Sequence, residues 1–459
     1  MRRSRKLFLS AATAVVAAGL ALYGVSPAGA AATTATFAKV SDWGSGWQGE
    51  FTITNGAGAA LTGWKLEFTM PPGTSVGSYW DALLTTSGQR YTFTNREYNG
   101  RIAGGQSVKF GFVGTGSGAP AGCLLNGVAC TGTVTPPTTP PTTTAPPAGT
   151  TPAAKNGLLR VCGRQLCNAQ GKAVQLRGMS THGLQWYANC VNDASLNVLA
   201  GEWNADVLRI SMYIQEGGYE TDPAGYTAKV NDLIEKATAR GLYAIVDWHM
   251  LSPGDPNYNL ARARTFFTAV AARHKDKTNI LYEIANEPSD VPWSAIKSYA
   301  DQIIPVIRAQ DPDGVVLVGT EDWSSLGASG DGQGVARIQA APVNAANIMY
   351  TFHFYAASHD DYYLNTFRDA IAKLPMFVTE FGTQQASGDG GNNFAMAQRY
   401  LDLMQQHKVS WVNWNYSDDM RTGAVFTPGT CNAGAYSGTA RLKEAGVWIR
   451  DRIRTPDDF

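Results

Sequence analysis

The sequence predicts a multidomain chain in which an all-β sandwich precedes an α/β domain with the (β/α)8, or TIM barrel, architecture. Residues 31–130 alternate apolar and polar side chains with a period of two, between clusters of Gly, Asn and Pro, which is typical of sandwich strands. Residues 156–459 instead repeat a short apolar run and a helix-period segment eight times, which favours eight βα units. The length of 459 residues also fits two to three domains.

Residues 1–30 are typical of a secretory signal peptide. Four of the first six residues are basic, Leu7–Leu22 is apolar, and Ala28-Gly29-Ala30 is a small-residue cleavage sequence. We therefore expect a secreted, extracellular protein. A membrane anchor is the alternative, but the apolar stretch is shorter than a spanning helix and a cleavage sequence follows it.

The first module and its linker follow the signal peptide. Glu50–Thr54, Lys65–Thr69 and Ser107–Phe112 each alternate as half-buried strands do, and no segment has helical periodicity. Residues 131–155 form a linker, because 17 of residues 131–154 are Thr or Pro and none is charged. Such a segment cannot build a core and favours an extended, semi-rigid spacer.

The second module supplies eight predicted strands. Between two of them, Val230, Leu233, Ile234 and Ala237 show the i, i+3, i+4, i+7 spacing of a helix. A doubly wound sheet is the alternative, but the chain has no Gly-rich phosphate loop. The predicted strands are Val174–Gly178, Val207–Met212, Leu242–Trp248, Ile280–Ile284, Val315–Gly319, Ile348–Phe354, Met376–Thr379 and Val409–Trp414.

The six cysteines of an exported chain suggest disulfides. Sequence alone allows 15 connectivities. We hypothesise that the two close pairs, Cys123/Cys130 and Cys162/Cys167, each close a short loop. That leaves Cys190/Cys431 to tie the two ends of the second module together.

Composition and charge exclude several classes of function. Apolar residues make up 44% of the chain and charged residues 16%, which excludes a disordered protein. The formal net charge is zero, so no nucleic-acid partner is expected. There is no internal apolar run long enough to span a membrane. The histidines show no metal-binding spacing, so we expect neither a metal nor another cofactor.

Polar and aromatic residues recur where the predicted barrel strands end. Active sites of these barrels lie at the C-terminal ends of the strands, whereas barrel interiors prefer Val, Ile and Leu. A ring of polar and aromatic side chains there therefore indicates a site. Its members, in chain order, are His182, Arg209, Asp247, His249, Asn286, Glu287, Trp323, His353, Tyr355, Glu380 and Trp414.

Glu287 and Glu380 are the candidate catalytic pair. Each follows a strongly apolar run, and a buried carboxylate is costly unless it is paired or hydrogen-bonded. Two carboxylates that face one groove are what glycosidic bond cleavage requires, because one protonates the leaving oxygen while the other attacks the sugar or activates water. A structural ion pair between one of them and Arg209 is the alternative for a single Glu.

Residues 156–453 resemble glycoside hydrolase family 5, in its bacterial endo-β-1,4-glucanase branch. The resemblance covers nearly the whole second module. It implies a retaining mechanism with Glu287 as acid/base and Glu380 as nucleophile. The segments that carry it are 177–183 (RGMSTHG), 247–249 (DWH), 284–288 (IANEP), 353–355 (HFY), 379–383 (TEFGT) and 411–414 (WVNW).

The resemblance also implies supporting roles around this pair. Arg209 and Tyr355 would hold Glu380 ionised and aligned, and Asn286 would hydrogen-bond the 2-hydroxyl of the reacting sugar. The remaining residues would contact substrate: His249 and His353 line that subsite, Trp414 stacks under it, His182 lies near it, and Trp186 and Trp323 are more distant platforms.

The first module, from Ala35 to Cys130, resembles carbohydrate-binding module family 2. Members of that family stack a flat line of aromatic rings on an insoluble polysaccharide. The resemblance implies that Trp43, Trp80 and Tyr98 form this line, while Trp64 belongs to the core. Modules with a local disulfide like Cys123/Cys130 also occur on chitin-degrading enzymes, so the bound polymer is cellulose or chitin.

The expected function is that of a monomeric endoglucanase, or cellulase, acting on cellulose-type β-1,4-glucan. Chitosan is the alternative substrate, alone or in addition. Glu321 and Asp322 flank Trp323, and Asp418 and Asp419 follow the last strand. These carboxylates would pair with glucosamine ammonium groups. A non-catalytic polysaccharide-binding protein is a remote alternative, since both candidate catalytic residues are intact.

Overall fold

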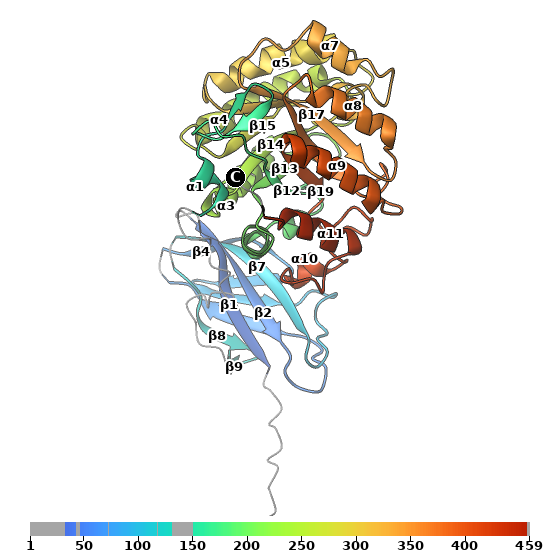
Figure 1. Cartoon of the computed structure of the whole chain (residues 1–459). Coiled ribbons are helices and arrows are strands. Elements are labelled where there is room, and N and C mark those ends of the chain that lie inside the picture. The colour runs from blue at the N-terminus through green and yellow to red at the C-terminus, as the bar shows by residue number, and fades with distance from the viewer. Residues whose placement is uncertain (1–32, 43–45, 72, 117, 131–149, 457–459) are drawn as a thin grey trace, which may run out of the picture. The chain divides into compact units, whose positions relative to one another are not determined.

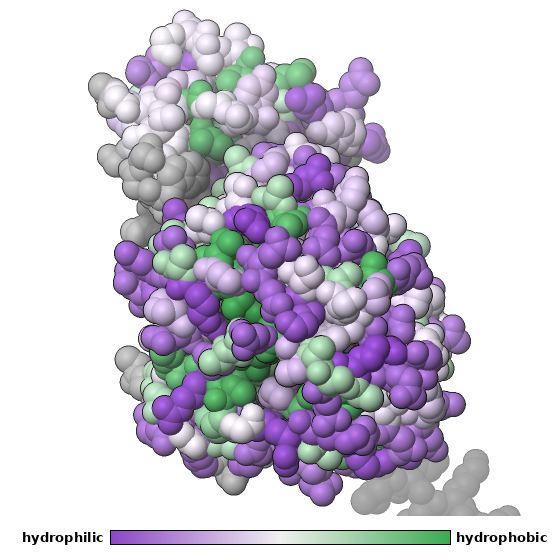
Figure 2. Space-filling model, turned by 90° about the horizontal axis from the view of Figure 1, so that it is seen from above, coloured by the Kyte–Doolittle hydropathy of each residue, from purple (hydrophilic) through white to green (hydrophobic). Residues whose placement is uncertain are grey.

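A computed structural model describes residues 33–42, 46–71, 73–116, 118–130 and 150–456. The chain divides into two compact units, Met1–Thr139 and Pro140–Phe459. The predicted signal peptide and Trp43 lie outside the described residues. On the face shown in Figure 2, hydrophilic side chains predominate and hydrophobic ones lie in small patches among them. No described helix is long and apolar enough to cross a membrane.

The first unit is a sandwich of two antiparallel sheets, ordered β1-β2-β7-β4 and β5-β6-β3-β8-β9. Alternate side chains of β2 and β3 are buried, and rings from both sheets stack in the core, such as Phe51 on Phe68 at 5.4 Å. Trp64 is buried there, as expected, and so is Trp47. No helix occurs among the residues described in this unit. The strands are β1 Thr34–Asp42, β2 Gly46–Thr54, β3 Lys65–Thr69, β4 Ser75–Trp80, β5 Leu83–Ser87, β6 Arg90–Thr94, β7 Ser107–Thr115, β8 Ala121–Leu125 and β9 Val128–Ala129.

The second unit is a closed barrel of eight parallel strands, β12 to β19 in chain order, which excludes the doubly wound alternative. Helices surround the barrel (Figure 1). The strands are β12 Arg177–Ser180, β13 Val207–Tyr213, β14 Tyr243–His249, β15 Ile280–Glu283, β16 Val315–Val318, β17 Ile348–Tyr355, β18 Met376–Gly382 and β19 Trp411–Trp414. The longer helices are α3 Pro223–Ala239, α4 Leu260–His274, α5 Trp293–Arg308, α8 Asp361–Ile371, α9 Phe394–His407 and α11 Glu444–Ile453. Shorter helical segments are α1 Pro152–Asn156, η1 Ala188–Cys190, α2 Asp193–Asn197, η2 Val198–Glu202, η3 Pro256–Asn259, α6 Glu321–Ser324, α7 Gly334–Ala340 and α10 Thr430–Ala433.

The first barrel strand begins three residues later than the predicted Val174–Gly178. A short hairpin, β10 Arg160–Cys162 with β11 Gln165–Cys167, places Leu166 in the cluster that fills the barrel interior. Val174 and Leu176 join the same cluster. Val174 and Leu176 are therefore apolar because they pack in the core just before β12 begins. The sequence pattern alone does not distinguish such residues from residues of the strand itself.

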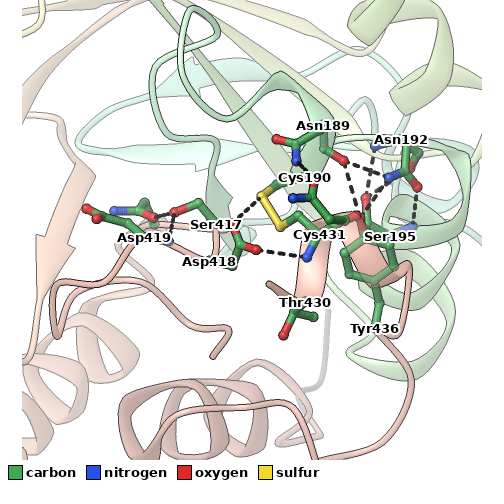
Figure 3. Close-up of a disulfide and its surroundings, with 12 residues drawn as sticks. Asn189, Cys190, Asn192, Ser195, Ser417, Asp418, Asp419, Thr430, Cys431 and Tyr436 are labelled. Atoms are coloured by element: carbon green, nitrogen blue, oxygen red, sulfur yellow. Dashed lines mark hydrogen bonds between the residues drawn. A yellow bond between two sulfur atoms is a disulfide. The ribbon is translucent and has the colours of Figure 1, made fainter. Parts of the chain in front are cut away.

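The three hypothesised disulfides are present: Cys123–Cys130, Cys162–Cys167 and Cys190–Cys431. The last joins η1, after the first barrel strand, to α10, after the last strand (Figure 3). Beside it, Asp418 accepts a hydrogen bond from the Cys431 backbone N–H at 2.9 Å. The disulfide and this bond thus fix two loops at the C-terminal end of the barrel.

Candidate active site

Arg209 is the central cation of the site. It lies on β13 inside the barrel and is 0% exposed. Its nitrogens lie 2.9 Å from Asp247, 2.7 Å from Glu283 and 3.0 Å from Glu380, which come from three other strands. Burial opposes the charge of Arg209, but these carboxylates outweigh burial and raise its pKa. The guanidinium therefore stays protonated, and a buried charge persists because it is paired.

Glu380, on β18, is held as an ionised carboxylate. Its Oε2 accepts from Arg209 Nη1, and its Oε1 accepts from Tyr355 Oη at 2.5 Å. Burial favours the protonated form, but the positive charges of His353 and Arg209 outweigh burial and lower the pKa of Glu380. A carboxylate that is buried, ionised and aligned by two donors has the properties of a nucleophile.

Glu287 lies four residues beyond the end of β15 and is held differently. Its Oε1 lies 2.9 Å from His353 Nδ1. Burial raises the pKa of Glu287 and the negative charge of Glu380 adds to this, while the hydrogen bond from His353 acts in the opposite direction. The net direction is upward, so Glu287 keeps its proton to higher pH than an ordinary glutamate. That is the property of a general acid.

The two carboxyl groups face one another at short range. One oxygen of Glu287 and one of Glu380 lie within 4.8 Å. Their pKa values move in opposite directions. A close pair of carboxyl groups, one protonated and one ionised, can protonate a leaving oxygen and attack the carbon that bears it.

Asn286 and His249 complete the floor of the site. Asn286 Oδ1 accepts from Arg209 Nη2 at 2.6 Å, and its amide nitrogen lies 3.4 Å from His249 Nε2. Burial and the nearby Arg209 hold the pKa of His249 well below its usual value. Neutral His249 therefore donates from Nδ1 to Asp247 Oδ2 at 2.7 Å and keeps Nε2 as an acceptor. Its ring stacks on Trp414, with centroids 5.3 Å apart.

The pair opens into a cleft of about 870 Å³ whose walls include His182, Trp186 and Trp414. Trp186 is 47% exposed, and His182 is buried with Nε2 at 3.6 Å from Asp419. Trp323, which is 46% exposed, lines an adjoining hollow of about 270 Å³ together with Glu287 and Tyr355. The structure thus brings the barrel residues predicted from sequence to one continuous region.

The aromatic residues predicted on the first unit are placed less completely, because Trp43 is outside the described residues. Tyr98 is 69% exposed and donates to Asp81 Oδ1 at 2.7 Å. Trp80 is half-buried at the end of β4, and its ring covers Gly111, where an added Cβ would lie 2.2 Å from the indole.

Sequence reasoning assigned no role to four residues that build the site. Glu283 holds two nitrogens of Arg209, and Thr379 lies 2.8 Å from His353 Nε2. Asp247 was listed in the ring of strand-end residues without a role, and Tyr213 stacks on His249 at 4.1 Å. A signal did exist for Glu283, since it is a charged residue inside the apolar run of a predicted strand.

Two groups of side chains in the described residues have metal-ligand spacing. One consists of Glu287, His353 and Glu380, and the other of Cys190, Asp418 and Cys431. The cysteines of the second group form a disulfide. In the first group both His353 nitrogens have hydrogen-bond partners, Glu287 and Thr379. Neither donor set resembles a typical metal centre.

Comparison with known proteins agrees with this geometry. Residues 167–420 match the family described as cellulase (glycosyl hydrolase family 5), and residues 33–130 match the cellulose binding domain. Endoglucanase E-5 of Thermobifida fusca is 51% identical over 97% of each chain, and endoglucanase CelA of Streptomyces lividans is 51% identical over 99% of each. The solved catalytic domain of Thermobifida fusca endoglucanase Cel5A aligns with TM-score 0.65 and 59% identity over 66% of this chain and 100% of that one. The chain therefore belongs to glycosyl hydrolase family 5, the cellulases, and carries a cellulose-binding domain of carbohydrate-binding module family 2 before its barrel.

Proposed function

We propose that this protein is a secreted endoglucanase that cleaves internal β-1,4 bonds of cellulose by a retaining double displacement, with Glu287 as acid/base and Glu380 as nucleophile. The observation that carries the proposal is the close pair of carboxyl groups whose pKa values move in opposite directions. Carboxyl groups about 5–5.5 Å apart favour retention, whereas inversion needs about 6.5–9.5 Å to admit a water. The oxygen separation within 4.8 Å supports retention.

The proposed reaction has two steps. Glu380 attacks the anomeric carbon while Glu287 gives its proton to the departing glycosidic oxygen, which leaves a glycosyl ester on Glu380. Glu287, now ionised, then takes a proton from a water that attacks the same carbon and releases Glu380. Arg209 and Tyr355 hold Glu380 in line, and the amide of Asn286 supplies a donor for the sugar 2-hydroxyl.

Subsites on both sides of this pair would hold the glucan chain. We propose that Trp414 stacks under the reacting sugar, because its ring is fixed against His249 at the base of the cleft. Trp186 would support sugars further along that cleft, and Trp323 would support the leaving-group side, since it shares a hollow with Glu287. His182 and His353 would contact substrate or orient the groups that do.

The contacts of the acidic residues support cellulose over chitosan. Glu321 accepts from the Trp293 backbone N–H at 2.8 Å and from Arg337 Nε at 2.7 Å, and it is buried. Asp418 accepts from a backbone N–H, and Asp419 lies against His182. These three carboxylates already have partners, so they offer little to an ammonium group, whereas Asp322, the fourth, is half-buried in the turn beside Trp323. The cellulose-binding domain at the N-terminus points to the same polymer.

Secretion and polymer binding are part of the proposal. The predicted N-terminal signal peptide and the three disulfides suit an extracellular compartment. Trp80 and Tyr98 would stack on insoluble cellulose, and Tyr98 is well exposed for this.

The test is reducing-end release from carboxymethyl-cellulose and from highly deacetylated chitosan by the wild type, Glu287→Gln and Glu380→Gln. We expect activity on the cellulose derivative, and a loss of at least about 100-fold in each variant. Proton NMR of freshly cleaved cellopentaose should show the β anomer first. A variant with near-wild-type rate, or an α product, would refute the assignment; stronger activity on chitosan would change the substrate.

A further inference from the structure

The segment after β16 contains a left-handed turn without glycine. Asp322, Trp323 and Ser324 have φ of 53°, 59° and 55°, and Leu326 has φ of 59°. Residues with a Cβ rarely adopt these values, and they do so where the surrounding structure fixes them, often at functional sites. The surroundings here include the segment that carries Glu287.

The turn holds the main chain on both sides of Glu287. Ser324 Oγ donates to the carbonyl oxygen of Asn286 at 2.6 Å, and the Trp323 backbone N–H donates to the carbonyl oxygen of Pro288 at 2.9 Å. Residues 286 and 288 directly flank the acid/base. Both bonds come from left-handed residues, so a regular helical turn at this position would not present the same two donors.

The hydroxyl of Ser324 has a fixed orientation. The side chain is 0% exposed. Its oxygen is approached by two donors, the Thr320 backbone N–H at 3.3 Å and Thr351 Oγ1 at 3.1 Å. A hydroxyl has one proton and two lone pairs, so with both lone pairs engaged its proton goes to Asn286. Water does not compete for this bond, because the group is buried.

The turn is also anchored on its outer side. Glu321 is bonded to the N-terminus of α5 through Trp293 and to α7 through Arg337. Arg337 in turn donates to both oxygens of Asp331, at 2.8 and 2.9 Å. The indole of Trp323 projects into the hollow that it shares with Glu287. One rigid turn thus carries an aromatic platform and braces the neighbouring acid/base.

We propose that Ser324 is a positioning residue for Glu287, and that the left-handed turn 322–324 sets the acid/base in register with Trp323. This inference rests on the proposed function of Glu287. The turn makes no hydrogen bond to Glu380, and the Asn286 side chain has its own anchor on Arg209. Loss of the Ser324 hydroxyl therefore disturbs proton donation and leaves the nucleophile in place.

The experiment compares two substrates that differ in their need for an acid. Cellopentaose requires protonation of its leaving oxygen, whereas 2,4-dinitrophenyl β-cellobioside releases a phenolate that leaves without it. We expect Ser324→Ala to lower kcat/KM for cellopentaose at least tenfold and to change that for the aryl substrate less than threefold. Ser324→Gly lacks the same hydroxyl but suits the positive φ, so it should show the same selective loss even if the alanine variant folds poorly.

Controls separate this inference from the proposed function. Ser410→Ala deletes another buried serine hydroxyl of the barrel, one that accepts from Leu176 at 2.9 Å, and should affect neither substrate. Glu287→Gln should show the same selectivity in a stronger form. If Glu287→Gln is unselective, the proposed role of Glu287 is wrong. If Glu287→Gln is selective but the Ser324 variants lose neither rate, or both equally, only the positioning role is refuted.

Discussion

Replacing Glu283 with Gln tests whether the buried charges around Arg209 act as one balanced cluster. Glu283 is 0% exposed, bonds Arg209 at 2.7 and 3.2 Å, and lies 3.8 Å from His353. The amide has nearly the same shape but no charge. Breaking a buried ion pair from one side typically costs about 3–5 kcal/mol. At roughly 2–3 °C per kcal/mol for a domain of this size, we expect Tm to fall by about 6–15 °C.

The loss should depend on pH in a defined direction. Burial lowers the pKa of His353, but hydrogen bonds to Glu283 and Glu287 outweigh burial and raise it to about 9. A histidine whose pKa is raised on folding contributes stability below its unfolded pKa, near 6.5, and loses it as the pH rises through the folded value. Without Glu283, this contribution shrinks. The difference in Tm between wild type and Glu283→Gln should therefore be largest at pH 6 and smaller at pH 9.

Thermal unfolding of the two proteins at pH 6, 7.5 and 9 measures this. Glu235→Gln is the matched control, since Glu235 pairs with Lys277 at 2.9 Å but its side chain is 49% exposed. Exposed pairs contribute about 0–1 kcal/mol, so this control should shift Tm by less than about 3 °C. A Glu283→Gln shift as small as the control's, and equal at all three pH values, would refute the reasoning.

Three further predictions follow from the site and the fold. The kcat/KM for cellopentaose should fall as the pH drops through the lowered pKa of Glu380 and as it rises through the raised pKa of Glu287. The alkaline limb should be absent from kcat/KM profiles with an activated aryl cellobioside, whose leaving group needs no proton. The double substitution Cys190→Ser and Cys431→Ser removes a disulfide between residues 241 apart in the chain. It should lower the free energy of unfolding by up to about 5 kcal/mol relative to the oxidised wild type, as measured by urea unfolding. Trp80→Ala should weaken binding to insoluble cellulose and spare hydrolysis of the soluble derivative, whereas equal losses would indicate a structural role.

The sequence predicted the barrel and the position of its candidate catalytic carboxyl groups for a physical reason. Parallel strands of a closed barrel end at one rim, so residues that follow each apolar run must meet there, however far apart they lie in the chain. Glu287 and Glu380 were found in this way. The two short disulfides could also be predicted from the sequence, because close spacing leaves few partners for each cysteine.

The sequence did not predict the features that depend on side-chain burial or on backbone handedness. Glu283 occupies a strand position where an apolar residue is the norm, and its pairing with Arg209, which lies two strands away in the barrel, explains it. Within residues 322–324 the left-handed turn contains no Gly or Asn, and Asp322 alone is of a type that tolerates positive φ, so its composition gives only a weak signal. Both features depend on contacts between segments that are distant in the chain, and a local sequence pattern does not predict such contacts.

One cluster of charges shifts the pKa values of two glutamates in opposite directions because it contacts them unequally. Glu380 is buried and Glu287 is largely so, with 13% of its side chain exposed, and burial alone would favour the protonated form of both. Glu380 receives a hydrogen bond from Arg209 and another from Tyr355, whereas the Glu287 carboxyl is hydrogen-bonded to His353. Glu283 and Asp247 hold the other edge of the guanidinium that donates to Glu380. The proposed division into acid and nucleophile therefore depends less on the two glutamates themselves than on which of them the buried guanidinium contacts.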